Sequence, residues 1–334
     1  MIQAKALICD EKQNFSIRDV ILPDPADDQI VIKTVYSGVS IGTEFALVKN
    51  KISWGPYPLC TGYMGTGIVE KVGSKISNFE KGDKVYFRGN SFINLKNGQK
   101  VSCVCGTHSS YIVVNPNTPY GAYKMPEGAP MEETSMFVLP AVGLYGVDMV
   151  KPNVGEIIIV YGCGLIGLGV IAACSHRGCV VIAVDINSKR LEKAKIFGAD
   201  YLIDAKKQNV KDEVKKIVPE GADTVFECTG IPSCINQTIE LCKTHGSYVW
   251  QGNYGNVPVL FNFLPAHGRR LKMFFPCDDG GQAFRKAVIK NITTGILPWG
   301  KAITNRITYK DAPAIFEKIN NGDNEIMGVT IKWE

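Results

Sequence analysis

One segment, residues 156–177, constrains the fold of this chain more than any other. It begins with the β-branched run Ile157-Ile158-Ile159-Val160, passes through Gly162-Cys163-Gly164-Leu165-Ile166-Gly167, and carries no charge between residues 157 and 174. An uncharged stretch of this length is typical of a membrane span. Its glycines and its β-branched start instead predict a strand, a tight turn and a buried helix. We therefore expect no membrane span.

The turn in this segment has the spacing GxGxxG, directly between the predicted strand and the predicted helix. Gly162 permits the tight turn, Gly164 lets a pyrophosphate approach the backbone, and Gly167 allows close packing of helix on strand. Leu165 and Ile166 open the helix, whose N-terminus offers unpaired N–H groups and a partial positive charge to phosphates. The motif therefore predicts a dinucleotide-binding site.

Strand and helix patterns alternate through the middle of the chain. Predicted strands cover residues 156–161, 179–185, 201–203, 223–227, 247–252 and 271–276, and predicted helices cover 165–177, 188–197, 210–218 and 231–244. Gly178, Gly198 and Gly246 stand where helix C-caps belong. Alternation of this kind predicts an α/β fold with a parallel, doubly wound sheet.

The parts of the chain on either side of this region have different secondary-structure patterns. The first 125 or so residues contain short β patterns broken by Gly and Pro, followed by a helical pattern at 132–150. The tail contains helical patterns at 281–294 and 310–320 and a closing strand at 328–333. We expect this strand to pair with the N-terminal β domain. The predicted domains are residues 1–137 and 276–334 for the β domain and residues 138–275 for the inserted nucleotide-binding domain.

An acidic residue, Asp185, ends the strand that follows the glycine turn, roughly 20 residues beyond Gly164. A carboxylate there accepts hydrogen bonds from the ribose hydroxyls and repels a 2′-phosphate. Asp185 therefore favours NAD as the cofactor. The following helix carries Lys189 and Arg190, which leaves NADP open as the alternative.

Charge and cysteine content exclude other function classes. The net charge is +5, and the lysines and arginines are scattered rather than clustered, which argues against nucleic-acid binding. Several of the eleven cysteines lie in apolar runs, and the N-terminus has no apolar leader. Both observations indicate a reducing, cytoplasmic setting.

Several further segments resemble the medium-chain dehydrogenase/reductase superfamily, the zinc alcohol dehydrogenases and their relatives. They include GYMGTGIVEKVG at residues 62–73, KGDKV at 81–85, AKIFGAD at 194–200 and FECTG at 226–230, and YSGVSIGTE at 36–44 resembles the bacteriochlorophyllide dehydrogenase-like branch. The resemblance implies a GroES-like catalytic domain, a Rossmann domain and a homodimer formed through the edge of the Rossmann sheet. It also implies cofactor contacts beyond the glycine turn and Asp185, at Ile186, Arg190, Thr229, Gly252 and Phe274.

The sequence departs from this family at the catalytic zinc. The resemblance places zinc ligands just before Gly42, at position 63 and near residues 139–142, where this chain has Ile41, Tyr63 and Leu139-Pro140-Ala141-Val142. A catalytic zinc site needs about three protein ligands, and none is present at these positions. The four cysteines of the family's structural zinc site are also missing, because only Cys103 and Cys105 lie in that region. We therefore predict that no metal is bound.

Without zinc, hydrogen-bond donors must stabilise the substrate oxygen during hydride transfer, each contributing roughly 3–4 kcal/mol. The candidate catalytic residues are Thr43, Ser40 and Tyr63, with Tyr63 alternatively a filler of the vacated metal pocket. Glu44 is a candidate base or a structural acid, and His108 is a candidate proton shuttle or a packed side chain.

The sequence thus predicts a zinc-independent oxidoreductase that transfers a hydride between NAD(H) and a small-molecule alcohol or carbonyl, such as a sugar, polyol or secondary-metabolite alcohol. Two alternatives remain open at this stage. One is a quinone or enone reductase that uses NAD(P)H, and the other is a non-catalytic nucleotide-binding protein.

Overall fold

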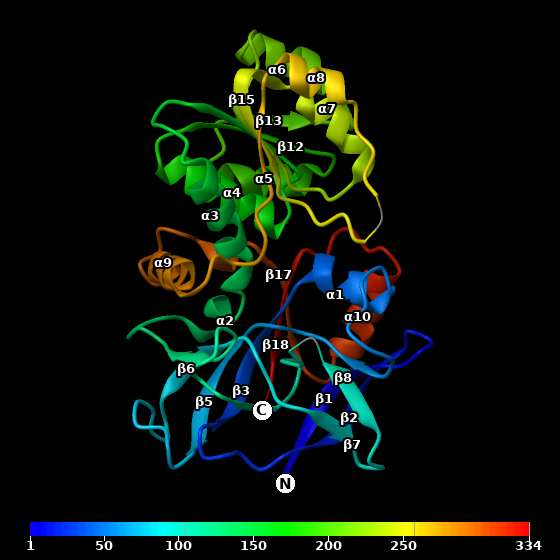
Figure 1. Cartoon of the computed structure of the whole chain (residues 1–334), viewed down its shortest axis with the longest axis vertical. Helices are drawn as coiled ribbons and strands as arrows, with labels where there is room; N and C mark the ends of the chain where they lie inside the picture. The colour runs from blue at the N-terminus through cyan, green and yellow to red at the C-terminus, as the bar shows by residue number, and fades with distance from the viewer. Residues whose placement is uncertain (104, 257, 334) are drawn as a thin grey trace. The chain divides into compact units, whose positions relative to one another are not determined.

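The computed structural model describes residues 1–103, 105–256 and 258–333. It divides into two compact units, residues 1–137 with 289–334 and residues 138–288 (Figure 1). We call these the first unit and the second unit. The second unit interrupts the first in sequence, and the helix α9 (Gln282–Thr293) runs from the second into the last part of the first.

The first unit contains a small closed barrel and a larger sheet. The barrel consists of β1 (Ile2–Cys9), β2 (Phe15–Leu22), β7 (Ile93–Leu95), β8 (Lys100–Cys103) and β4 (Leu59–Cys60). The larger sheet has the order β10 (Ala122–Lys124), β6 (Lys84–Phe87), β5 (Gly65–Val72), β3 (Ile30–Val39), β18 (Gly328–Lys332) and β17 (Ile303–Thr308), and β9 (Tyr111–Val114) pairs with β3. Because β18 lies antiparallel to β3, the predicted return of the C-terminal strand to the N-terminal β domain is confirmed.

Further helices and an aromatic cluster complete the first unit. The helices are α1 (Ile41–Val48), α2 (Met131–Thr134) and α10 (Ala312–Asn320), and a 3₁₀ turn spans Trp299–Lys301. The rings of Phe15, Phe45 and Phe316 pack with centroids 5.3–6.1 Å apart. Each buried phenylalanine stabilises the fold by about 1.5–3 kcal/mol. This cluster joins α1, α10 and the barrel, and so fixes the position of α1.

The second unit contains one parallel sheet in the order β13 (Tyr201–Asp204), β12 (Val180–Asp185), β11 (Ile157–Tyr161), β14 (Ala222–Glu227), β15 (Cys242–Trp250) and β16 (Lys272–Phe274). The helices are α3 (Val138–Val150), α4 (Leu165–His176), α5 (Ser188–Ile196), α6 (Val210–Ile217), α7 (Ile235–Ile239) and α8 (Phe263–Gly268). Figure 1 shows α3 and α4 on one face of the sheet and α6, α7 and α8 on the other. The predicted doubly wound parallel sheet is confirmed.

The strand, turn and helix predicted for residues 156–177 are present as β11 and α4. Gly178 and Gly198 follow α4 and α5 with φ of +82° and +104°, as a C-cap glycine requires. Within the described residues, no helix combines the length and the apolar character needed to cross a bilayer.

Two predicted helices differ from the structure. The helix predicted at 231–244 ends at Ile239, because residues from Cys242 onward already pair with β14. Gly246 therefore lies within β15 and caps no helix. The helix predicted at 132–150 is divided into α2 and α3. Pro140 lies in the first turn of α3, where its missing N–H removes no helical hydrogen bond.

Candidate active site

Three of the predicted catalytic residues come together in the first unit. Ser40 is the N-cap residue of α1, and Thr43 lies in its first turn. Tyr63 follows the sharp turn at Gly62, whose φ is +88°. Ser40 and Tyr63 are 4% and 8% exposed, and the hydroxyls of Ser40 and Thr43 lie close enough to the Tyr63 phenol to lower its pKa. The structure thus gathers three hydroxyl groups at one place.

Tyr63 is held as a neutral phenol. Burial raises its pKa to about 12, Glu44 adds to this effect, and the hydroxyls of Ser40 and Thr43 and the charge of Arg88 oppose it. The guanidinium of Arg88 lies 5.4 Å from the centroid of the Tyr63 ring. Because the pKa lies so far above neutrality, the phenol keeps its proton and can donate a hydrogen bond to an oxygen atom.

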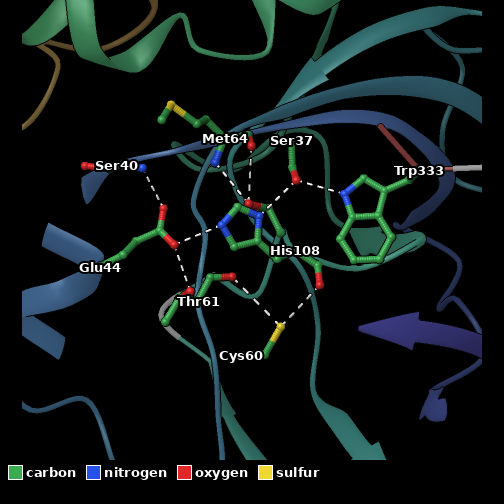
Figure 2. A network of polar contacts seen from close by, with 9 residues as sticks. Ser37, Ser40, Glu44, Cys60, Thr61, Met64, His108 and Trp333 are labelled. Carbon is green, nitrogen blue, oxygen red and sulfur yellow. Dashed lines mark hydrogen bonds and ion pairs between the residues drawn. The ribbon is translucent and has the colours of Figure 1, made fainter. Parts of the chain in front are cut away.

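Glu44 and His108 form a fully buried pair, and Glu44 is joined to Ser40 (Figure 2). His108 Nε2 lies 2.9 Å from Glu44 Oε2, which also accepts a hydrogen bond from the Thr61 hydroxyl at 2.7 Å. The other carboxylate oxygen, Oε1, accepts a hydrogen bond from the backbone N–H of Ser40 at 2.7 Å. Glu44 therefore holds the N-terminus of α1, and with it Ser40, to the turn that carries Thr61.

The opposite side of the His108 ring continues the chain of hydrogen bonds (Figure 2). Trp333 Nε1–H donates to Ser37 Oγ at 2.8 Å, and Ser37 Oγ lies 2.9 Å from His108 Nδ1. An indole N–H can only donate, so Ser37 accepts from Trp333 and has its own proton free for Nδ1. This direction places a proton on Nε2, which then donates to Glu44.

The order Ser37–His108–Glu44 resembles a hydrolase triad, but its environment rules out that role. All three residues are 0% exposed, and the serine hydroxyl is occupied by Trp333 and His108. A nucleophile must reach its substrate. The network is therefore internal, and the exposed end of the cluster is formed by the half-buried Thr43.

The residues that the resemblance places at the family's zinc position lack the groups that usually hold zinc. Tyr63 stands where the resemblance expects one ligand, and the neighbouring Met64 is fully buried. The Met64 backbone N–H donates to Thr107 Oγ1 at 3.1 Å. Across the part of the chain that the structure describes, no group of three His, Cys, Asp or Glu side chains stands close enough to hold a metal ion.

In the second unit, the predicted cofactor residues lie on loops at the carboxyl ends of parallel strands, where ligands bind in such sheets. Gly162 follows β11, Ile186 follows β12, Thr229 follows β14, Gly252 follows β15, and Phe274 ends β16. Leu165 and Ile166 open α4, and Arg190 lies in the first turn of α5. The sheet thus brings these predicted residues to one edge.

The glycine turn has the geometry that a dinucleotide phosphate needs. Gly162 has φ of +98°, and a Cβ on Gly167 would lie 2.0 Å from the Gly162 carbonyl oxygen. A Cβ on Gly164, by contrast, would meet open space. Among the described residues, no side chain caps the N-terminus of α4. The backbone around Gly164 is thus open to an anion, and the residues fit a pyrophosphate.

Asp185 is fixed at the end of β12 by two backbone groups. The Cys163 N–H donates to its Oδ2 at 2.7 Å, and the Asn187 N–H donates to its Oδ1 at 2.9 Å. Each carboxylate oxygen retains a further lone pair for a ribose hydroxyl. Asp185 thereby also ties the glycine turn to β12.

Sequence reasoning missed several residues of these networks. Ser37 and Thr61 hydrogen-bond to the His108–Glu44 pair, and Trp333 hydrogen-bonds to Ser37. Trp333 is 296 positions from Ser37, so no local pattern could connect them. Glu227 was missed as well, although a charged residue at the end of a buried strand is a usable signal. The same position drew attention to Asp185 in the neighbouring strand.

Comparison with known proteins agrees with this geometry. The family described as "Alcohol dehydrogenase GroES-like domain" matches residues 26–127, and "Zinc-binding dehydrogenase" matches residues 166–294. The chain belongs to the medium-chain dehydrogenase/reductase superfamily. The predicted GroES-like and Rossmann fold classes are thereby confirmed.

Individual relatives are distant. Alcohol dehydrogenase 6 of Peromyscus maniculatus is 28% identical over 72% of this chain and 73% of its own length. D-xylulose reductase of Saccharomyces cerevisiae is 24% identical over 95% of this chain and 94% of its own. The crystal structure of benzyl alcohol dehydrogenase from Acinetobacter calcoaceticus superposes with a TM-score of 0.87 at 18% identity, and each chain is covered completely.

Proposed function

We propose that this member of the superfamily is an NAD(H)-dependent oxidoreductase that interconverts a small-molecule alcohol and carbonyl without catalytic zinc. The observation that carries the proposal is the Tyr63 phenol, held neutral among Ser40 and Thr43 at a position where the family places a zinc ligand. The alcohol dehydrogenase and D-xylulose reductase among the relatives support an alcohol, sugar or polyol as the substrate class.

In this proposal, separate groups of residues hold the cofactor and the substrate oxygen. The glycine turn and Asp185 hold the nicotinamide dinucleotide, which when bound supplies or accepts the hydride. Tyr63 donates a hydrogen bond to the substrate oxygen, and a well-placed donor of this kind contributes about 3–4 kcal/mol to the transition state. Ser40 and Thr43 lie beside the phenol, and the half-buried Thr43 links it to water. During carbonyl reduction the phenol gives its proton to the substrate oxygen and regains one from water through Thr43, and during alcohol oxidation the proton moves the other way.

Asp185 supports NAD rather than NADP. Both of its oxygens are held in place by backbone N–H groups, so the carboxylate cannot turn away from a 2′-phosphate. Repulsion at this position disfavours the phosphorylated cofactor. A cytoplasmic location remains a prediction from the cysteine content.

The experiment is a comparison of NADH and NADPH oxidation with a ketone panel, a quinone and an enone, using protein of measured metal content. We expect NADH-dependent ketone reduction that survives dialysis against a chelator. Stoichiometric zinc that is required for activity would contradict the zinc-free mechanism. Preference for NADPH with a quinone or enone would favour the reductase alternative, and NADH binding without turnover would favour a non-catalytic protein.

We further propose a homodimer formed through the free edge of β16. The segment that leads into β16 carries the exposed apolar side chains of Leu260, Phe263 and Leu264, and Phe275 directly follows the strand; each is more than 60% exposed. Phe275 stacks on Trp250 with ring centroids 5.5 Å apart. Exposed apolar groups beside an open sheet edge are typical of an association surface.

We expect the wild-type chain to sediment as a dimer and Leu264→Glu as a monomer, because a carboxylate cannot be buried at an apolar interface without a partner. Val154→Glu is the matched control, since Val154 is also an exposed apolar residue of the second unit, 82% exposed. A monomeric wild-type protein, or an equal effect of both substitutions, would contradict this interface.

A further inference from the structure

The buried carboxylate of Glu227 lies at the end of β14, among the loops at the carboxyl edge of the sheet. Glu227 is 0% exposed. Its Oε1 accepts hydrogen bonds from the backbone N–H of Thr229, at 2.9 Å, and from the Thr229 hydroxyl. Its Oε2 accepts from the Gly230 N–H, at 3.2 Å, and from the Tyr254 phenol. Four donors from two different loops thus converge on one side chain.

These hydrogen bonds fix the loop after β14 against the glycine turn. The Thr229 hydroxyl is occupied by Glu227 and by the Ile231 N–H, so the side chain has one orientation. In that orientation its methyl group lies against Gly162, where a Cβ would come within 2.8 Å of Thr229 Cγ2. The Cys228 N–H also donates to the Tyr161 carbonyl oxygen at 2.8 Å. Glu227 therefore sets the surface beside the predicted phosphate site.

Glu227 also fixes the loop after β15, through its backbone carbonyl oxygen and through its carboxylate. The backbone N–H groups of Gln251 and Gly252 donate to the Glu227 carbonyl oxygen at 3.0 and 2.8 Å. A Cβ on Gly252 would lie 2.4 Å from the Gly230 nitrogen and 3.0 Å from Glu227 Oε2. Tyr254 then closes the loop by donating its phenol to the carboxylate. The loops after β11, β14 and β15 therefore share one anchor.

The Tyr254 phenol keeps the proton that it donates to Glu227. Burial and the hydrogen bond to Glu227 both raise the pKa of Tyr254, so the phenol remains protonated at neutral pH. A hydrogen bond to a charged, buried acceptor is stronger than one between neutral groups. Its loss removes the hydrogen bond by which Tyr254 ties the loop after β15 to Glu227.

We propose that Glu227 and Tyr254 are positioning residues for the cofactor, because together they hold three cofactor-binding loops in the geometry that NAD(H) requires. This inference rests on the proposed function, since it assigns a role within the same nucleotide site. Neither residue needs to touch the cofactor, because they act through Thr229, Gly230 and Gly252.

The test is Tyr254→Phe, with Tyr248→Phe as the matched control. Tyr248 is a fully buried tyrosine of the same sheet, and its phenol hydrogen-bonds to the Thr238 hydroxyl on α7 at 2.8 Å rather than to Glu227. Each substitution removes one buried phenol hydrogen bond. The measurements are NADH affinity by fluorescence titration, thermal unfolding, and hydrogen–deuterium exchange of the segment 228–232.

We expect Tyr254→Phe to weaken NADH binding about tenfold and to speed exchange in residues 228–232. Tyr248→Phe should lower thermal stability and leave NADH affinity within about twofold of wild type. Wild-type NADH affinity in Tyr254→Phe, or an equal loss in both variants, would overturn the positioning role. Failure of the wild-type chain to bind NADH would instead overturn the proposed function, and this inference with it.

Discussion

Replacing Tyr63 with phenylalanine is expected to lower kcat by about two orders of magnitude, which is the usual effect of removing one oxyanion donor. The ring remains to fill the pocket, so only the hydroxyl beside Ser40 and Thr43 is lost. Because the donor acts more strongly on the transition state than on the bound substrate, KM should change much less than kcat. Steady-state kinetics with the ketone identified in the substrate panel measure both.

Two comparisons make this result interpretable. Tyr123→Phe removes a phenol of the same unit that donates to the Thr118 carbonyl oxygen at 3.3 Å on the surface, and it should leave kcat unchanged. Thermal unfolding of Tyr63→Phe should show a folded protein that loses about 1–3 kcal/mol of stability, as for the loss of one buried phenol. Wild-type kcat in Tyr63→Phe would show that Tyr63 only fills the space of the missing metal ligand.

The parallel sheet could be predicted from the sequence because its signals are local. Each strand is a short apolar run, and the glycines at 178 and 198 end the helices with the positive φ that their sequence position implied. The helix predicted at 231–244 ends earlier than expected because Cys242 pairs with Ala222 on β14. That pairing depends on a distant strand, and local helix propensity does not report it.

In the candidate site, too, the sequence predicts features with local signals but not contacts between distant residues. Ser40, Thr43 and Glu44 could be found because they share one short motif, and Tyr63 because it replaces an expected ligand. Which side chain contacts which could not be read from the sequence, because the partners lie on separate strands. Glu44 meets His108 across 64 positions, and the sequence left both roles of that histidine open.

Replacing Glu44 with leucine is expected to destabilise the first unit by about 3–5 kcal/mol. The change leaves the Ser40 N–H, the Thr61 hydroxyl and His108 Nε2 buried without their acceptor. Glu132→Leu is the control, because Glu132 also accepts two side-chain hydrogen bonds but is 22% exposed. Its loss should be about 1 kcal/mol or less. Urea unfolding at neutral pH measures both.

The double variant Glu44→Leu/His108→Leu tests whether Glu44 and His108 stabilise the fold as a hydrogen-bonded pair or independently of each other. Removing both partners of a buried pair costs less than the sum of the single losses, since neither group is then left buried and unpaired. We expect a coupling of about 1–3 kcal/mol between the two positions. Strictly additive losses would contradict the buried pair as a unit. In that case Glu44 would act mainly through its hydrogen bond with the Ser40 backbone N–H. His108 would act by packing against Phe316, whose ring centroid lies 5.5 Å away.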